Sequence, residues 1–100
     1  MRTGHLEVWR GGESERVPLD GESLTVGRDF DNDVALPDDR AVSRRHAVFE
    51  QLPGGWWIRD LGSTNGTYVN GVEVVGERPV FAGDEIRVGD TRLVFRDQPR

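Results

Sequence analysis

The sequence contains no cysteine, no lysine and no long apolar segment. Without cysteine there are no disulfides and no cysteine-based metal sites, so the redox compartment stays open. No stretch approaches the roughly 20 apolar residues that a membrane-spanning helix needs, and no apolar signal segment follows Met1. We therefore expect a cytoplasmic protein that has no membrane partner.

The charge balance limits the partners further. The net charge is −5 at pH 7, and every cationic residue is arginine. Binding along nucleic acid needs a basic face that neutralises several phosphates, so we expect no nucleic-acid partner. A local basic pocket could still hold one phosphate. The absence of lysine is explained by a GC-rich genome, which we favour, or by the suitability of arginine for paired contacts with phosphate oxygens.

The length and turn spacing predict one all-β domain. A chain of 100 residues is one domain, with an expected core over about residues 5–96 and a polar tail over residues 97–100. No window of a dozen residues has a helical period. The predicted strands are residues 6–9, 16–19, 23–26, 34–36, 46–51, 56–59, 67–69, 72–75, 84–88 and 91–95. Turn signals recur about every eight to twelve residues, which is typical of a β-sandwich or barrel.

Local patterns predict particular turns and core positions. Asn70-Gly71 indicates a type I′ hairpin turn, and Gly89-Asp90 indicates a second tight turn. Trp56 and Trp57 point to opposite faces of one strand, so one is buried and the other lies nearer the surface; the pattern leaves open which. Alternation predicts these core residues: Leu24, Val26, Ile86, Val88, Leu93 and Phe95.

Three segments carry polar groups that suit a phosphate dianion. They are Arg28, then Ser43-Arg44-Arg45-His46, then residues 61–71 with their Ser-Thr-Asn-Gly-Thr run. A guanidinium group offers paired donors and keeps its proton near neutral pH, and hydroxyl and amide groups add further donors. No convincing nucleophile or metal cluster accompanies this set. The segments therefore indicate a module that reads phosphate on a partner.

The order of these segments is more specific than any one of them. The motifs are Gly27-Arg28, Ser43-x-x-His46, Ser63-Thr64-Asn65-Gly66-Thr67 and Asn70-Gly71. Together they resemble the forkhead-associated (FHA) domain, a module that binds phosphothreonine. The spacing from Arg28 to Ser43 and from His46 to Asn65 also agrees with that family. The resemblance covers nearly the whole chain and implies an FHA-like β-sandwich of two antiparallel or mixed sheets with binding loops at one end.

The resemblance implies five phosphopeptide-binding residues. Arg28, Ser43 and Thr64 would contact the phosphate, Arg44 would assist, and Asn65 would pair with the main chain of the bound peptide. Arg28, Ser43 and the Thr64-Asn65 segment also have an ordinary explanation when taken alone. Arg28 could be a solvated arginine at a strand end, Ser43 could cap a turn, and Asn65 opens a common turn dipeptide.

The resemblance assigns supporting roles to five further residues: Gly27, His46, Gly66, Asn70 and Gly71. His46 would brace the binding loops by hydrogen bonding, and Gly66 would supply a backbone conformation that a β-carbon disfavours. Thr67 is expected to begin a strand. Alternation points Arg45 away from Arg44, so we expect Arg45 on a solvated face.

Two other patterns suggest functions that we do not favour. Residues 29–33 carry three alternating aspartates, as at the start of a calcium loop, but Val34 replaces the glycine and Arg40 the glutamate that such a loop requires. Ser43 and His46 could suggest a hydrolase, but the sequence has no Gly-x-Ser-x-Gly elbow. We therefore expect no enzyme activity, no metal and no cofactor.

The leading hypothesis is a monomeric, phosphothreonine-dependent binding module in Ser/Thr kinase signalling, whose partner is a kinase or a kinase substrate. The alternative is a phospho-independent or autoinhibitory regulator that docks onto a folded enzyme or an attached effector domain through the same loops. Autoinhibition by a phosphorylated leader is poorly supported, because Thr3 is the only hydroxyl residue there. Whether the chain is a whole protein stays open.

The sequence leaves the peptide preference open as well. The family selects the third residue after the phosphothreonine through loops that here include residues 37–42. Arg40 would favour an acidic residue there, although a solvated arginine is the simpler explanation.

Overall fold

The computed structural model describes the backbone of residues 3–98 and the side chains of residues 4–96. It contains eleven strands, and the described residues form no helix that could cross a membrane. The strands are β1 (Thr3–Arg10), β2 (Glu13–Pro18), β3 (Ser23–Gly27), β4 (Val34–Ala35), β5 (Ala47–Leu52), β6 (Gly55–Asp60), β7 (Thr67–Val69), β8 (Val72–Glu73), β9 (Glu77–Val80), β10 (Glu85–Val88) and β11 (Thr91–Gln98).

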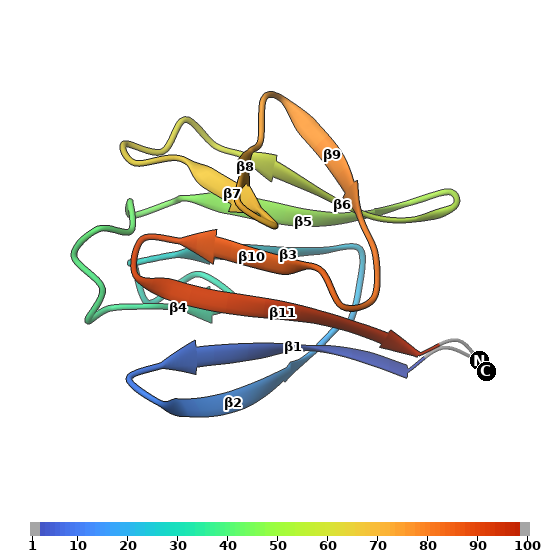
Figure 1. Ribbon diagram of the computed structural model, residues 1–100, viewed down its shortest axis with the longest axis horizontal. Coiled ribbons are helices and arrows are strands. Elements are labelled where there is room, and N and C mark those ends of the chain that lie inside the picture. Colours follow the sequence, from blue (N-terminus) through green and yellow to red (C-terminus); the bar gives the residue numbers. More distant parts are fainter. Residues whose placement is uncertain (1–2, 99–100) are drawn as a thin grey trace.

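The strands form two sheets that pack face to face (Figure 1). The six-stranded sheet has the order β2-β1-β11-β10-β7-β8, and the five-stranded sheet has the order β4-β3-β5-β6-β9. The registered strand pairs are antiparallel except β3 with β4, which is parallel. The predicted all-β sandwich with antiparallel and mixed sheets is therefore confirmed.

Alternation along the strands builds the core between the sheets. The six predicted core residues are all buried, because each faces the opposite sheet. The rings of Phe49 and Phe95 stack across the interior with centroids 6.4 Å apart. This stacking adds a specific contact to their apolar burial. Trp56 is 5% exposed, whereas Trp57 on the other face of β6 is only half-buried. The core tryptophan is therefore Trp56.

Most of the predicted strand ends shift by one to three residues, and one strand was not predicted. β9 (Glu77–Val80) was not predicted, because Pro79 cannot donate a ladder hydrogen bond; β9 is an edge strand, where proline is tolerated. β11 continues to Gln98, since its end pairs with the beginning of β1. Residues 97–98 thus belong to a strand and not to a tail, and residues 99–100 lie outside the described residues. The predicted strands over 16–19, 34–36 and 72–75 end one or two residues earlier.

Both predicted tight turns occur. Asn70 has a φ of 51° and Gly71 a φ of 84°. Both central residues thus have the positive φ that a type I′ turn requires. In the second turn Gly89 has a φ of 58° and Asp90 does not have a positive φ. That is the pattern of a type II′ turn. These turns set the register of β7 with β8 and of β10 with β11.

Several connections meet at one end of the sandwich. Loops 28–33, 36–46 and 61–66 and the turn at residues 89–90 lie at the left in Figure 1. The beginning of β1 and the end of β11 lie side by side at the opposite end. The sheets thus place loops from distant parts of the sequence next to one another.

Candidate functional site

A pocket of about 340 Å³ opens among the loops at this end of the sandwich. The residues that line it are Arg28, Arg40, Ala41, Val42, Ser43, Arg44, Thr64 and Asn65. All five residues predicted to bind a phosphopeptide thus lie together, with Arg40 added. The lining contains three arginines and no carboxylate, so the local potential is positive although the whole chain is acidic.

Arg28 follows directly after β3 and is half-buried at the pocket wall. Its backbone N–H donates to the carbonyl oxygen of Ser43 at 3.0 Å, which attaches the end of β3 to loop 36–46. The Nε atom of Arg28 is buried and has no hydrogen-bond partner within the described part of the chain. Because an unpaired buried donor is unfavourable, an acceptor on a ligand would stabilise this side chain.

Gly27 permits the close contact between loops 28–33 and 36–46. A β-carbon at Gly27 would overlap the carbonyl oxygen of Arg44 and lie 2.7 Å from Nδ2 of Asn32. The buried Asn32 occupies this space and donates from Nδ2 to Arg44 O at 2.9 Å and to Asp29 O at 2.8 Å. Any larger residue at position 27 would therefore push apart the two loops that carry Arg28 and Arg44.

His46 connects loop 36–46 to loop 61–66. Its side chain is fully buried, and Nδ1 accepts the backbone N–H of Ser43 at 3.0 Å. Nε2 lies 2.8 Å from the carbonyl oxygen of Gly66. Since Nδ1 is the acceptor, Nε2 carries the proton and donates it. One imidazole ring thus sets the separation of the two loops.

Two direct hydrogen bonds join the same loops at the pocket surface. The hydroxyl oxygen of Ser43 accepts the backbone N–H of Thr64 at 3.0 Å, and Nδ2 of Asn65 donates to the carbonyl oxygen of Ala41 at 2.9 Å. The hydroxyl proton of Ser43 remains available to a phosphate oxygen. The Oδ1 atom of Asn65 can likewise accept an N–H from a bound peptide.

Asp60 organises loop 61–66 from the end of β6. Its carboxylate accepts hydrogen bonds from the N–H of Gly62 and of Ser63, both at 2.9 Å, from the Ser63 hydroxyl at 2.6 Å and from the Thr67 hydroxyl at 2.7 Å. Ser63 Oγ in turn accepts the N–H of Gly66 at 2.9 Å. Burial by itself raises the pKa of Asp60, but these hydrogen bonds together outweigh it and leave the pKa below its ordinary value of 3.8.

Asp39 anchors loop 36–46 to the turn between β10 and β11. The carboxylate is 9% exposed; Oδ1 accepts the N–H of Ala41 at 3.0 Å, and Oδ2 accepts the N–H of Asp90 at 2.8 Å and the hydroxyl of Thr91 at 2.7 Å. Ala41 lines the pocket and holds Asn65, so Asp39 acts on the pocket through the backbone of Ala41.

Other candidate residues lie outside the pocket. Arg45 pairs with Asp31 at 2.9 Å, and both side chains are exposed. Asn70 donates to Asp84 at 3.0 Å and accepts the N–H of Glu85 at 3.0 Å, at the far end of β7 from the pocket. The Asn70-Gly71 turn therefore holds the β7–β8 hairpin against β10, and it does not line the pocket.

Sequence reasoning missed three residues that organise the site: Asn32, Asp39 and Asp60. The aspartate at position 60, three residues before Ser63, is a local turn signal that could have been recognised. The main partners of Asp39 are 51 and 52 residues away, so no local pattern indicates its role.

Comparison with known proteins places these features in a family. A family model described as FHA domain matches residues 24–89. The oxoglutarate dehydrogenase inhibitor of Corynebacterium diphtheriae is 44% identical over 98 residues, which cover 97% of this chain and 67% of that protein. The glycogen accumulation regulator GarA of Mycolicibacterium smegmatis is 44% identical over 96 residues, which cover 95% of this chain and 60% of that protein. The chain therefore spans about three fifths to two thirds of these relatives.

A solved structure has the same fold. It comes from work described as "Structural and functional analysis of phosphothreonine-dependent FHA domain interactions". It is 34% identical and superposes with a TM-score of 0.84, and the match covers 98% of this chain and 99% of that one. The predicted FHA-like arrangement of the two sheets is thereby confirmed.

Proposed function

This chain belongs to the FHA domain family, and we propose that its pocket binds phosphothreonine in a partner protein. One observation carries the proposal: five residues from three separate loops meet in a pocket that holds three arginines and no carboxylate. A phosphothreonine carries about −1.5 to −2 charges at pH 7, which such a pocket complements. The phosphothreonine-dependent interactions named for a 34% identical FHA structure support the same ligand.

The roles that we propose follow the donors present in the pocket. Arg28 supplies paired guanidinium donors, and its buried Nε gains an acceptor when phosphate binds. The hydroxyls of Ser43 and Thr64 donate to phosphate oxygens, and Arg44 adds positive charge at the rim. Asn65, held by Ala41 through its amide nitrogen, uses Oδ1 to pair with the peptide main chain.

The energetics suit a reversible switch. A hydrogen bond to a charged group contributes about 1.5–3 kcal/mol. Two or three such bonds would separate phosphorylated from unphosphorylated peptide by roughly 10² to 10⁴ in affinity, at about 1.4 kcal/mol per factor of ten. The complex can therefore form on phosphorylation and dissolve after dephosphorylation.

We propose further that the chain binds and performs no reaction. Nδ1 of His46 accepts the backbone N–H of Ser43, and Nε2 is occupied by Gly66, so neither ring nitrogen is free to take the Ser43 hydroxyl proton. The partner is a Ser/Thr kinase or a kinase substrate in the cytoplasm, where such kinases find ATP. The relatives named as an inhibitor and a regulator support a binding role.

An oriented phosphothreonine-peptide library identifies a ligand, and calorimetry then measures its affinity beside phosphoserine and unphosphorylated versions. We expect Arg28→Ala to weaken phosphothreonine binding by roughly a hundred-fold or more, since two charge-assisted bonds are lost. Arg45→Ala is the matched control, because Arg45 is an exposed arginine next to the pocket that pairs with Asp31. Unchanged affinity in Arg28→Ala would contradict the proposed phosphate site.

A second candidate function is regulation of a metabolic enzyme by docking onto its folded surface. The names of the two relatives, an inhibitor of oxoglutarate dehydrogenase and a regulator of glycogen accumulation, favour it. The two functions differ in their need for phosphate. A partner that binds equally well before and after phosphatase treatment would favour docking without phosphate, and a loss of binding after treatment would favour the phosphothreonine reader.

A further inference from the structure

The outer face of the six-stranded sheet carries a row of four residues that the proposed function does not use. The register pairs Trp9 with Arg92, Arg92 with Arg87, and Arg87 with Tyr68, across β1, β11, β10 and β7. Each has a buried neighbour along its strand, so the four side chains point away from the core. Because neighbouring strands lie about 4.8 Å apart, this Trp–Arg–Arg–Tyr row spans roughly 14 Å.

The row contains two arginines, and only Arg92 forms an ion pair within the part of the chain that the structure describes. Arg87 and Arg92 are directly opposite each other, a placement of like charges that destabilises a sheet. Arg92 is partly neutralised, because its Nε lies 3.3 Å from Glu85 and its guanidinium lies 5.2 Å from the ring centre of Trp9. Arg87 forms no ion pair with any residue that the structure describes. An anion placed against Arg87 would relieve the repulsion.

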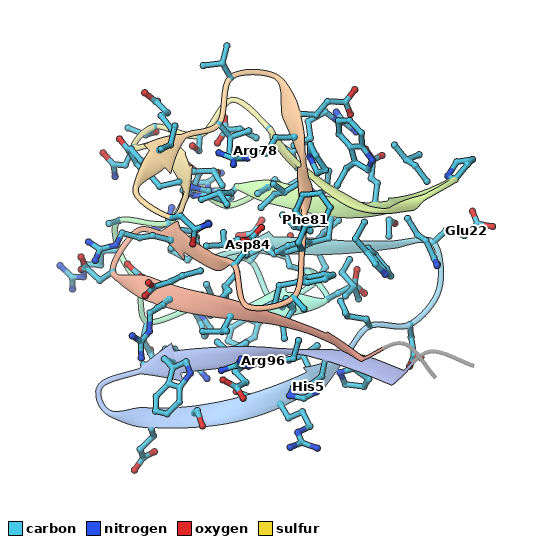
Figure 2. The ribbon with its side chains drawn as sticks, turned by 45° about the vertical axis from the view of Figure 1, so that its right-hand side comes forward. His5, Glu22, Arg78, Phe81, Asp84 and Arg96 are labelled. Carbon is cyan, nitrogen blue, oxygen red and sulfur yellow. The ribbon has the colours of Figure 1, made fainter. Side chains whose placement is uncertain are left out.

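Two carboxylates on this face, Glu7 and Glu85, already have partners, and Glu73 on β8 continues the row beyond Tyr68, with which it is in register. Glu7 lies 3.4 Å from Nε of Arg96, on the strand beside its own. Figure 2 shows Arg96 next to His5, with which it is in register. Glu85 is the nearest carboxylate along β10 and is engaged by Arg92. The unpaired positive charge is therefore concentrated at Arg87.

A hollow of about 530 Å³ lies beside Arg87. Its lining consists of Tyr68, Gly71, Glu85, Arg87 and Gly89. The two glycines have no side chains to fill the space, so a group from a partner can approach the guanidinium and the tyrosine ring together. Exposed arginine and aromatic side chains are the residue types enriched at protein–protein contacts.

We propose that the Trp–Arg–Arg–Tyr row docks an acidic segment of a partner protein, with one of its carboxylates held by Arg87 and its apolar side chains on Tyr68 and Trp9. None of the four residues lines the phosphate pocket, so this contact needs no phosphate. Aromatic and arginine side chains also suit single-stranded nucleic acid. Glu7, Glu85 and the net charge of −5 oppose a long polyanion, so the occupant that we propose is a short segment with few carboxylates.

The two surfaces can serve one partner. The ring of Tyr68 comes within 3.3 Å of the position of a β-carbon on Gly66, which belongs to loop 61–66 of the phosphate pocket. The row therefore begins beside that loop and continues across the sheet. A partner held by its phosphothreonine would find the row at high effective concentration, and avidity would follow without any change in either site.

The test uses NMR on the isotope-labelled chain and a peptide of alternating glutamate and leucine, with a glutamine-for-glutamate peptide as the uncharged comparison. We expect saturable shifts at the Trp9 indole N–H and the Arg87 Nε–H, and none with the uncharged peptide.

Arg87→Gln should weaken binding of the acidic peptide roughly ten-fold, because one charge-assisted contact is lost. Arg59→Gln is the matched control, since Arg59 is an exposed sheet arginine that pairs with Glu50 at 3.1 Å. Arg28→Ala should leave the acidic peptide unaffected, which separates this result from any failure of the phosphate site.

Several outcomes would overturn the proposal: no saturable shifts, equal weakening by Arg59→Gln, or tighter binding of a single-stranded oligonucleotide than of the acidic peptide. Thermal unfolding gives a second readout. Because Arg87 faces Arg92, Arg87→Gln should leave Tm unchanged or raise it. A fall of several degrees would assign Arg87 a structural role instead.

Discussion

The two loops that form the pocket are braced by aspartates in different ways. Asp60 holds loop 61–66 through partners that are two, three and seven residues away. Asp39 holds loop 36–46 mainly through Asp90 and Thr91, which lie 51 and 52 residues further along the chain. Asp90 belongs to the turn between β10 and β11, and Thr91 begins β11 of the six-stranded sheet. One loop is organised by its own segment, whereas the other is organised by the closure of the sandwich.

This difference predicts how substitutions at the two aspartates would affect the two loops. A change at Asp60 should disturb loop 61–66 with little loss of fold stability, because the hydrogen bonds to this half-buried carboxylate all come from residues 62–67. Loop 36–46 depends on the contact between sheets, so a change at Asp39 weakens the fold and the pocket together. The coupling passes through Ala41, whose N–H binds Asp39 and whose carbonyl holds Asn65.

The largest effect is expected from Asp39→Asn. The amide nitrogen of asparagine cannot accept a hydrogen bond. At least one of the three donors, the N–H groups of Ala41 and Asp90 and the hydroxyl of Thr91, would therefore lose its acceptor in a buried site. We expect the free energy of unfolding to fall by about 3–4 kcal/mol, and phosphothreonine affinity to fall with it. Urea denaturation and calorimetry measure the two. Asp38→Asn is the control, since Asp38 is the exposed neighbour; equal losses in both variants would refute the role of Asp39.

An intermediate effect is expected from Gly89→Ala, compared with Gly62→Ala. Both glycines have positive φ, 58° and 80°, so alanine costs each about 1–2 kcal/mol. A β-carbon at Gly89 would also lie 2.7 Å from Val42 and 2.8 Å from Asp39, whereas at Gly62 it meets open space. We expect a loss of about 2–3 kcal/mol for Gly89→Ala, because overpacking is added to the backbone strain. Equal unfolding free energies for the two variants would show that the contact across the sandwich contributes nothing.

The smallest effect on stability is expected from Asp60→Asn, and this effect should depend on pH. Its folded pKa is lowered, so its contribution is present above the unfolded value of about 4 and is lost as pH falls through the folded pKa. At neutral pH we expect Asp60→Asn to be less stable by about 1 kcal/mol. Below about pH 4 the gap between wild type and variant should close. Chemical denaturation across this range measures the gap, and a gap that stays constant down to the lowest pH would contradict the assignment.

Much of the fold followed from local patterns because their physical causes are local. Alternation placed Ile86 and Val88 in the core, and the Asn70-Gly71 turn has the geometry that its residues predict. β9 escaped prediction, because Pro79 argues against a strand unless the strand is known to be an edge. The extension of β11 to Gln98 likewise depends on a partner strand at the other end of the chain.

The sequence by itself determined most of the strands, the two tight turns and the set of phosphate-suited residues, because side-chain period and turn chemistry act over a few neighbouring residues. Only the tertiary structure decided that Arg28, Ser43 and Thr64 share one pocket, that Asp39 braces it from the other sheet, and that Arg87 faces Arg92 without a carboxylate partner among the described residues. These relations are distances between segments far apart in the chain. They exist only once the two sheets have closed and their register is set.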